Sequence, residues 1–137
     1  MGEPSRPSID QSIVFTYTDD LEAGSRFFSD ILELELVVDQ GACHIYRLTD
    51  TSFIGVCNLP DRPKNKAAVT ITLVSDDVDE WHRYLTAKGI EYVNRPRHSP
   101  EFGVYSSLFI SPDGYRIEIQ HFDDKSWRHG PGQRDSS

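Results

Sequence analysis

The sequence predicts an α+β fold built from two tandem βαβββ units, and three observations lead to this expectation. The segment TYTDDLE at residues 16–22 aligns with LVSDDVD at residues 73–79, an offset of 57 residues. Each Asp-Asp pair precedes an amphipathic pattern of helical period, and short strand-like runs follow each helix. The match continues into the next strand, where LELV at 34–37 lies over IEYV at 90–93, offset by 56. A duplication explains this continuity better than the chance recurrence of a strand, a cap and a helix.

The first unit is predicted to contain four strands and one helix. Asp19 and Asp20 are suited to begin the helix, because carboxylates there accept bonds from unpaired backbone N–H groups and favour the positive end of the helix dipole. The helix is expected over about residues 21–31, with an apolar stripe of Ala23, Phe27, Phe28 and Ile31. The strands are expected at 12–18, 34–38, 43–48 and 53–57.

The second unit is predicted to repeat that order after a polar, proline-bearing connector at residues 58–66. A helix is expected near residues 77–88, and Gly89 supplies its C-terminal stop. Strands are expected at 69–74, 90–93, 104–110 and 115–122. We interpret residues 11–123 as a single domain, with unit one at 11–58, unit two at 67–123, a flexible arm at 1–10 and a flexible tail at 124–137.

The alternation within the fifth predicted strand assigns its two faces. Val69, Ile71 and Leu73 are apolar and are expected to meet the helix, which leaves Thr70, Thr72 and Val74 on the other face. By the repeat offset, Ile13, Phe15 and Tyr17 are expected on that other face in the first unit.

Composition excludes several partners. The 137 residues carry a formal charge of -8, which argues against nucleic acid and anionic membrane surfaces because both attract clustered Lys and Arg. No apolar run is long enough to span a membrane, and the first residues lack the apolar middle of a signal peptide, so a cytoplasmic location is expected. Cys43 and Cys57 are interpreted as buried thiols, since a cytosolic chain of this size needs no disulfide.

The chemistry-bearing stretch is SPDGYRIEIQHF at residues 111–122, where a Pro-Asp-Gly turn precedes a strand. Tyr115, Ile117 and Ile119 fall on one face of that strand, whereas Arg116, Glu118 and Gln120 fall on the other. This motif, both Asp-Asp helix starts and the order of the elements resemble the vicinal oxygen chelate superfamily, also called the glyoxalase, bleomycin-resistance and extradiol dioxygenase superfamily. The resemblance covers about residues 11–123.

The resemblance implies that each unit curls into half of a cup, that the sheets are mixed, and that the chain forms a homodimer. Metal-dependent members take ligands from the first, fourth, fifth and last strands, and Glu118 matches the last of these positions. The other positions align with Ile13 or Ser12, with residues 55–57, and with Thr70, none of which is a histidine or a carboxylate. A catalytic divalent metal ordinarily needs three such ligands, so no cofactor is expected, and a divalent metal would require atypical ligands.

Two interpretations of Glu118 remain open at this stage. In the structural interpretation, Glu118 pairs with Arg116 or with another neighbour on the same face. In the functional interpretation, it lies at the floor of a cleft and binds a guest. His44 also has two interpretations, either a hydrogen-bonded structural histidine, which is favoured, or a general base or metal ligand beside Glu118.

The remaining candidate ligand-binding residues are mainly aromatic or hydroxyl-bearing. On the predicted cup-facing positions they would line a pocket for a flat or cationic guest, and residues 94–103 would form its flap. The full set of predicted ligand-binding residues is Glu118, Arg116, His44, Tyr46, Phe15, Tyr17, Thr70, Thr72 and Tyr105.

Three function classes follow from these residues. The leading hypothesis is a protein that binds a small organic molecule without the usual metal, similar to the drug-sequestering branch of the superfamily. The alternative is a metal-dependent lyase, isomerase or dioxygenase that uses Glu118 with atypical ligands. A third class, a structural or regulatory partner domain, predicts an occluded cleft. The absence of a nucleophile elbow, a phosphate-binding loop and a dinucleotide fingerprint argues against most other enzymes.

Overall fold

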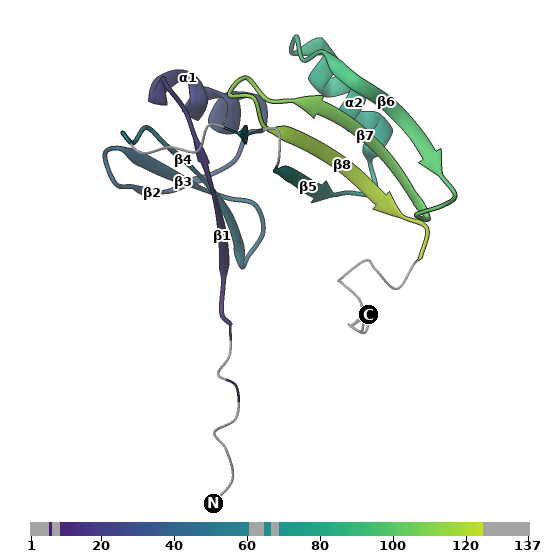
Figure 1. Cartoon of the computed structure of the whole chain (residues 1–137), viewed down its shortest axis with the longest axis horizontal. Coiled ribbons are helices and arrows are strands. Elements are labelled where there is room, and N and C mark those ends of the chain that lie inside the picture. The colour runs from purple at the N-terminus through teal and green to yellow at the C-terminus, as the bar shows by residue number, and fades with distance from the viewer. Residues whose placement is uncertain (1–5, 7–8, 61–64, 67–68, 125–137) are drawn as a thin grey trace, which may run out of the picture. The chain divides into compact units, whose positions relative to one another are not determined.

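The chain divides into two compact units, residues 1–63 and 64–137, whose boundary falls within the predicted connector. The computed structural model describes residues 6, 9–60, 65–66 and 69–124 (Figure 1). Most of the predicted arm at 1–10, most of the tail at 124–137 and residues 61–64 of the connector therefore lie outside the described residues. None of the helices in the described part has the length and hydropathy that a membrane-spanning helix requires.

Unit one forms a four-stranded mixed sheet in the order β1-β4-β3-β2. The β1 and β4 strands pair in parallel, and the other two pairings are antiparallel. The predicted order of strand, helix and three strands is confirmed, with β1 at Ser12–Tyr17, β2 at Leu36–Asp39, β3 at Cys43–Arg47 and β4 at Ser52–Cys57.

The first helix begins as predicted but changes its winding. The Asp20 carboxylate accepts a hydrogen bond from the Ala23 backbone N–H at 3.2 Å and so caps α1, Leu21–Arg26. The chain then continues as the π-helix η1, Phe27–Ile31, rather than as one uniform α-helix. Of the expected apolar stripe, Phe27 and Phe28 are buried, whereas Ala23 and Ile31 are only half-buried.

Unit two repeats the strand arrangement in the order β5-β8-β7-β6. Again the first and last strands of the unit pair in parallel, so the duplication inferred from the offset repeat is matched by equivalent topology. Val78 and Leu85 of α2 are fully buried, and Gly89 at φ 92° ends the helix region as predicted. The bounds are β5 Thr70–Val74, α2 Val78–Ala87, β6 Tyr92–Ser99, β7 Val104–Ile110 and β8 Arg116–Phe122.

The strand β6 is longer than the sequence predicted. Residues 94–99, which were expected to form part of a flap, extend the strand and leave only a short turn at residues 100–103. Pro96 has no backbone N–H to donate. It is tolerated because β6 is an edge strand, and no further strand on its outer side requires that donor. The register between β6 and β7 is irregular around this residue.

The predicted faces of β5 hold at its centre. Ile71 is buried, whereas Thr70, Thr72 and Val74 are exposed. The apolar side chains of β8 that share the inner face, Ile117 and Ile119, are also buried. Val69 was expected to meet the helix, but it precedes the strand and is 45% exposed, so that part of the prediction is wrong.

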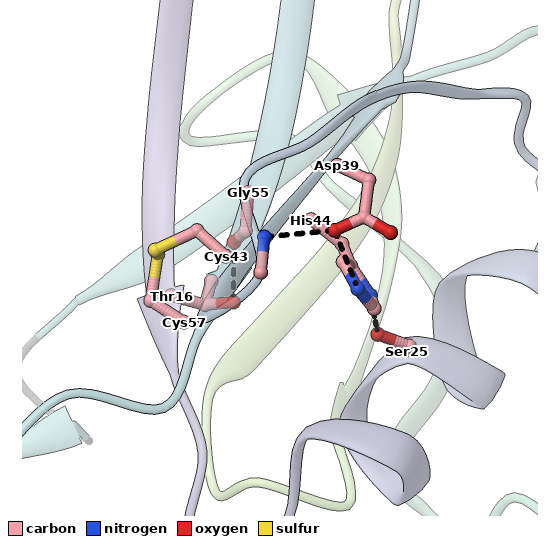
Figure 2. The surroundings of a disulfide bond; sticks show 8 residues. Thr16, Ser25, Asp39, Cys43, His44, Gly55 and Cys57 are labelled. Atoms are coloured by element: carbon pink, nitrogen blue, oxygen red, sulfur yellow. Dashed lines mark hydrogen bonds and ion pairs between the residues drawn. A yellow bond between two sulfur atoms is a disulfide. The ribbon is translucent and has the colours of Figure 1, made fainter.

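The prediction of two buried thiols is also wrong, because Cys43 and Cys57 form a disulfide (Figure 2). The two residues lie directly opposite one another in the antiparallel pairing of β3 and β4, with their Cα atoms 4.1 Å apart. Each cysteine alone fits a buried apolar strand, and only the register of the two strands brings the sulfur atoms together.

Candidate functional site

The face of the second sheet opposite α2 carries a pocket of about 750 Å³. This volume lies within the range of roughly 300–1,000 Å³ that small-molecule sites occupy. Its wall is formed by β6, the turn that follows it, β7 and β8. The ionisable side chains among the lining residues are Arg97, His98, Glu101, Arg116 and Glu118.

Glu118 lies at the centre of this face and is oriented by the neighbouring strand. Thr72 on β5 is its register partner, and the Thr72 hydroxyl donates a hydrogen bond to Glu118 Oε1 at 3.0 Å. Within the residues that the structure describes, the carboxylate forms no ion pair and no other hydrogen bond. The structural interpretation in which Glu118 pairs with Arg116 is therefore wrong.

Arg116 is held in the same way. Its Nε–H donates a hydrogen bond to the Thr70 hydroxyl at 3.1 Å, and Thr70 is its register partner on β5. The guanidinium has no ion-pair partner among the described residues, so its terminal nitrogen atoms keep their hydrogen-bonding capacity. Two threonines of one strand thus position two opposite charges on the next strand.

The rim of the pocket is fastened at the turn between β6 and β7. His98 Nε2 contacts Asp123 Oδ2 at 2.7 Å, and the Asp123 backbone N–H donates to the Gly103 carbonyl at 2.9 Å. Phe102 stands in this turn with 72% of its surface exposed. A large apolar ring at the mouth of a polar pocket is suited to cover a guest.

Four of the predicted ligand-binding residues converge on this site, and one other residue of unit two does not. Arg116 and Glu118 line the pocket, and Thr70 and Thr72 hold them. Tyr105 was expected to line the cleft, but its hydroxyl donates a hydrogen bond to Asp79 on α2, so it faces the helix side. That bond raises the pKa of Tyr105 above its ordinary value, because it stabilises the protonated phenol.

The predicted residues of β3 face the wrong way for a site on the open face of the first sheet. His44 Nδ1 and the Ser25 hydroxyl of α1 share a hydrogen bond at 2.6 Å, and His44 Nε2 lies 3.4 Å from Asp39 Oδ1 (Figure 2). Tyr46 is 2% exposed and packs against Phe28, with ring centroids 5.7 Å apart. Both side chains therefore belong to the helix side, and the structural interpretation of His44 is the one that its contacts support.

Ser25, His44 and Asp39 have the residue types of a catalytic triad, but the serine hydroxyl is not accessible to a substrate. Ser25 is 8% exposed. A nucleophilic serine needs room for a substrate carbonyl beside its oxygen, with donors placed for the developing negative charge. The buried hydroxyl instead ties α1 to β3, and Asp39 also accepts a hydrogen bond from the Gly41 backbone N–H at 2.8 Å.

Phe15 and Tyr17 lie on the opposite face of the first sheet, together with the disulfide. Phe15 is 41% exposed, and its ring covers Gly55 so closely that a Cβ at Gly55 would stand 2.5 Å from the ring. Their predicted side of the sheet is thus correct. Because they belong to unit one and Glu118 belongs to unit two, their predicted contact with the same guest stays a prediction.

The residues around Glu118 do not fit the divalent metal that the superfamily often uses. Its hydrogen-bond partner is a threonine hydroxyl, and the guanidinium of Arg116, two residues along β8 on the same face, repels a cation. In the described part of the chain, no group of three or more His, Cys, Asp or Glu side chains is arranged to hold a metal ion. At the aligned position on the fourth strand, Cys57 forms the disulfide and therefore offers no thiolate to a metal.

The predicted ligand-binding set omitted several lining residues, among them Gln120 and Phe122 of β8, and included neither Arg97 nor Phe102 of the expected flap. Gln120 and Phe122 continue the period-two alternation of Arg116 and Glu118, so the pattern contained the signal. Arg97 was expected within the flap at residues 94–103, whereas its register pairing with Ser106 places it on the sheet.

Comparison with known proteins identifies the family. The sequence model described as the Glyoxalase/Bleomycin resistance protein/Dioxygenase superfamily matches residues 11–119. The chain belongs to this superfamily. Its two four-stranded mixed sheets correspond to the tandem βαβββ fold of that superfamily, as predicted. A comparison with curated proteins gave no match.

Solved structures share the fold at low sequence identity. A glyoxalase/bleomycin resistance protein/dioxygenase from Nocardioides has a TM-score of 0.71 at 20% identity, covering 97% of this chain and 93% of its own. Lactoylglutathione lyase from Agrobacterium tumefaciens has a TM-score of 0.66 at 23% identity, covering 85% of this chain and 96% of its own. A glyoxalase/bleomycin resistance protein/dioxygenase family enzyme from Burkholderia phytofirmans has a TM-score of 0.68 at 16% identity, covering 82% of this chain and 98% of its own.

Proposed function

We propose that the chain binds a small organic molecule in the pocket of the second sheet, and that binding does not require the divalent metal used by many superfamily members. The observation that carries this proposal is the orientation of Glu118 by Thr72, with no ion-pair partner among the described residues. Because Oε2 keeps its acceptor capacity, a hydrogen-bond donor or a cation on a guest can form a charge-assisted bond with this carboxylate.

The surroundings of Glu118 further support a small organic guest. Leu108 and Val104 provide buried apolar surface on the pocket wall, and Phe102 and Phe122 provide aromatic surface. Polar groups stand among them at Asn94, Ser106 and Gln120. Binding sites for small molecules combine an apolar wall with a few placed polar groups in this manner. A guest with an aromatic or aliphatic part and at least one donor would use both kinds of surface.

The proposal is tested by screening a fragment library against ¹⁵N-labelled protein in metal-free buffer. We expect hits whose chemical-shift changes concentrate in residues 94–108 and 116–122. Glu118→Gln is the diagnostic variant, since it keeps the size of the side chain and removes its charge. Glu80→Gln on α2 is a matched control, because Glu80 is exposed, pairs with Arg83 on the same helix and does not line this pocket. Hits confined to other surfaces, or none at all, would refute the proposal.

The same variants test the enzymatic alternative. Tight binding of one divalent metal per chain, followed by turnover of a bound compound that stops with Glu118→Gln, would favour a metal-dependent lyase, isomerase or dioxygenase. We propose binding as the function because, among the residues that the structure describes, no group of three or more His, Cys, Asp or Glu side chains is arranged to hold a metal ion.

Assembly and location are further proposals. We propose a homodimer, which the superfamily often forms, and a cytoplasmic location. The disulfide makes the second proposal testable, because disulfides persist in oxidising compartments and are rare in the reducing cytosol. Alkylation of the protein in intact cells, followed by mass spectrometry, should find Cys43 and Cys57 as free thiols if the chain resides in a reducing cytosol.

A further inference from the structure

Arg116 and Glu118 face the pocket from alternate positions of one strand, so their backbones are roughly 7 Å apart along β8. Opposite charges at this spacing could bridge to each other, yet they do not. Each side chain instead forms a hydrogen bond with a threonine hydroxyl of β5, which acts as an acceptor toward arginine and as a donor toward glutamate. Thr70 accepts from the guanidinium, and Thr72 donates to the carboxylate.

This arrangement leaves particular atoms for a guest. The Arg116 bond uses Nε and leaves the two terminal nitrogens, which can donate two parallel bonds to a carboxylate. The Glu118 bond uses Oε1 and leaves Oε2 without a hydrogen bond to any described residue. Side chains that are already oriented lose less conformational entropy when a guest binds.

From this pairing we propose that the guest is a zwitterion, with an anionic oxygen group at Arg116 and an ammonium group at Glu118. The inference rests on the proposed binding function and names its substrate class. A guest with only a positive charge meets repulsion from Arg116, and a guest with only a negative charge meets repulsion from Glu118. A molecule with both charges a few bonds apart satisfies both side chains, and its apolar substituent contacts Phe102 and Phe122 at the pocket wall.

Three probes of one shape separate the charges: phenylalanine, phenylalaninamide and N-acetylphenylalanine. The first is zwitterionic, the second lacks the carboxylate and the third lacks the ammonium group. Titrations followed by ¹⁵N chemical shifts of β8 are carried out at about pH 6, where α-amino groups are protonated. We expect phenylalanine to bind at least about tenfold more tightly than either blocked probe, since each lost charge-assisted bond weakens binding by about that factor or more.

Two variants assign each charge to its side chain. Arg116→Gln is expected to abolish the preference for phenylalanine over the amide, and Glu118→Gln the preference over the N-acetyl compound. Arg95→Gln is the control, because Arg95 is exposed on β6 and does not line the pocket. That variant should keep both preferences.

Equal affinity for phenylalanine and either blocked probe would overturn the zwitterion inference, as would the absence of shifts in β8 with all three probes. The proposed binding function fails under a different result, namely a fragment screen without any pocket ligand. If neutral fragments occupy the pocket and phenylalanine shows no preference, the binding function stands and the zwitterion inference falls.

Discussion

Removing the disulfide by replacing Cys43 and Cys57 together with alanine is expected to lower the free energy of unfolding by about 3 kcal/mol. The two cysteines are separated by 14 positions. The bond therefore closes a loop of about 15 residues in the unfolded chain, for which loop entropy corresponds to about 3 kcal/mol at 25 °C. Domains of ordinary stability unfold at a cost of only about 5–15 kcal/mol, so the effect is large enough to measure.

Urea unfolding followed by circular dichroism separates the bond from the side-chain replacement. Oxidised wild-type protein should be the most stable, and reduced wild-type protein should lose about 3 kcal/mol. The double alanine variant serves as the control, because a reductant should not change its midpoint. Its stability should lie at or below that of the reduced protein, since Cys57 is 2% exposed and a smaller side chain leaves space in the core. Equal midpoints for oxidised and reduced wild-type protein, or two free thiols in the native protein under oxidising conditions, would refute this reasoning.

The other predictions concern the two helix contacts, the metal and the assembly. Ser25→Ala should destabilise unit one by about 1–3 kcal/mol in urea unfolding, because it removes the partly buried partner of His44; an unchanged midpoint would contradict this. The Asp79 contact raises the pKa of Tyr105, so its stabilising effect should be complete below the unfolded value of about pH 10 and be lost as pH rises through the higher folded value. Absorbance at alkaline pH should show that the phenol lost in Tyr105→Phe is one that titrates late, and the loss of a phenol with the ordinary midpoint would refute that contact. Elemental analysis of purified protein should find no stoichiometric divalent metal, and one metal per chain would favour the enzymatic alternative. Light scattering should give twice the 15.6 kDa chain mass, whereas a monomer mass would exclude the homodimer.

The fold could be predicted because its signals are local and occur twice. Asp20 caps α1 through its own side chain, and Gly89 ends the region of α2 at a positive φ, so these boundaries depend on neighbouring residues alone. The alternation along residues 116–122 also placed Arg116 and Glu118 on the same face as their threonine partners. Burial of one face makes such a period-two pattern reliable.

The errors arose where both faces of a strand carry mixed residues. His44 and Tyr46 alternate with Cys43 and Ile45, so no contrast between polar and apolar residues distinguishes the two faces of β3. Tyr46 is buried by its aromatic body against Phe28, and a tyrosine fits either face equally well from sequence. The disulfide depended on the register of β3 and β4, which the separate strand patterns do not determine.

The affinity of one pocket ligand for wild-type protein and for Glu118→Gln, measured by calorimetry in metal-free buffer, tests the central claim most directly. The ligand is the strongest fragment that maps to β8. We predict that the variant keeps its fold, judged by an unchanged circular dichroism spectrum, and binds about tenfold or more weakly. With the Gln oxygen at the Thr72 hydroxyl, an amide NH2 takes the place of Oε2 and cannot accept the charge-assisted hydrogen bond of the guest. Equal dissociation constants for the two proteins would make Glu118 a structural residue and contradict the claim that its carboxylate binds the guest.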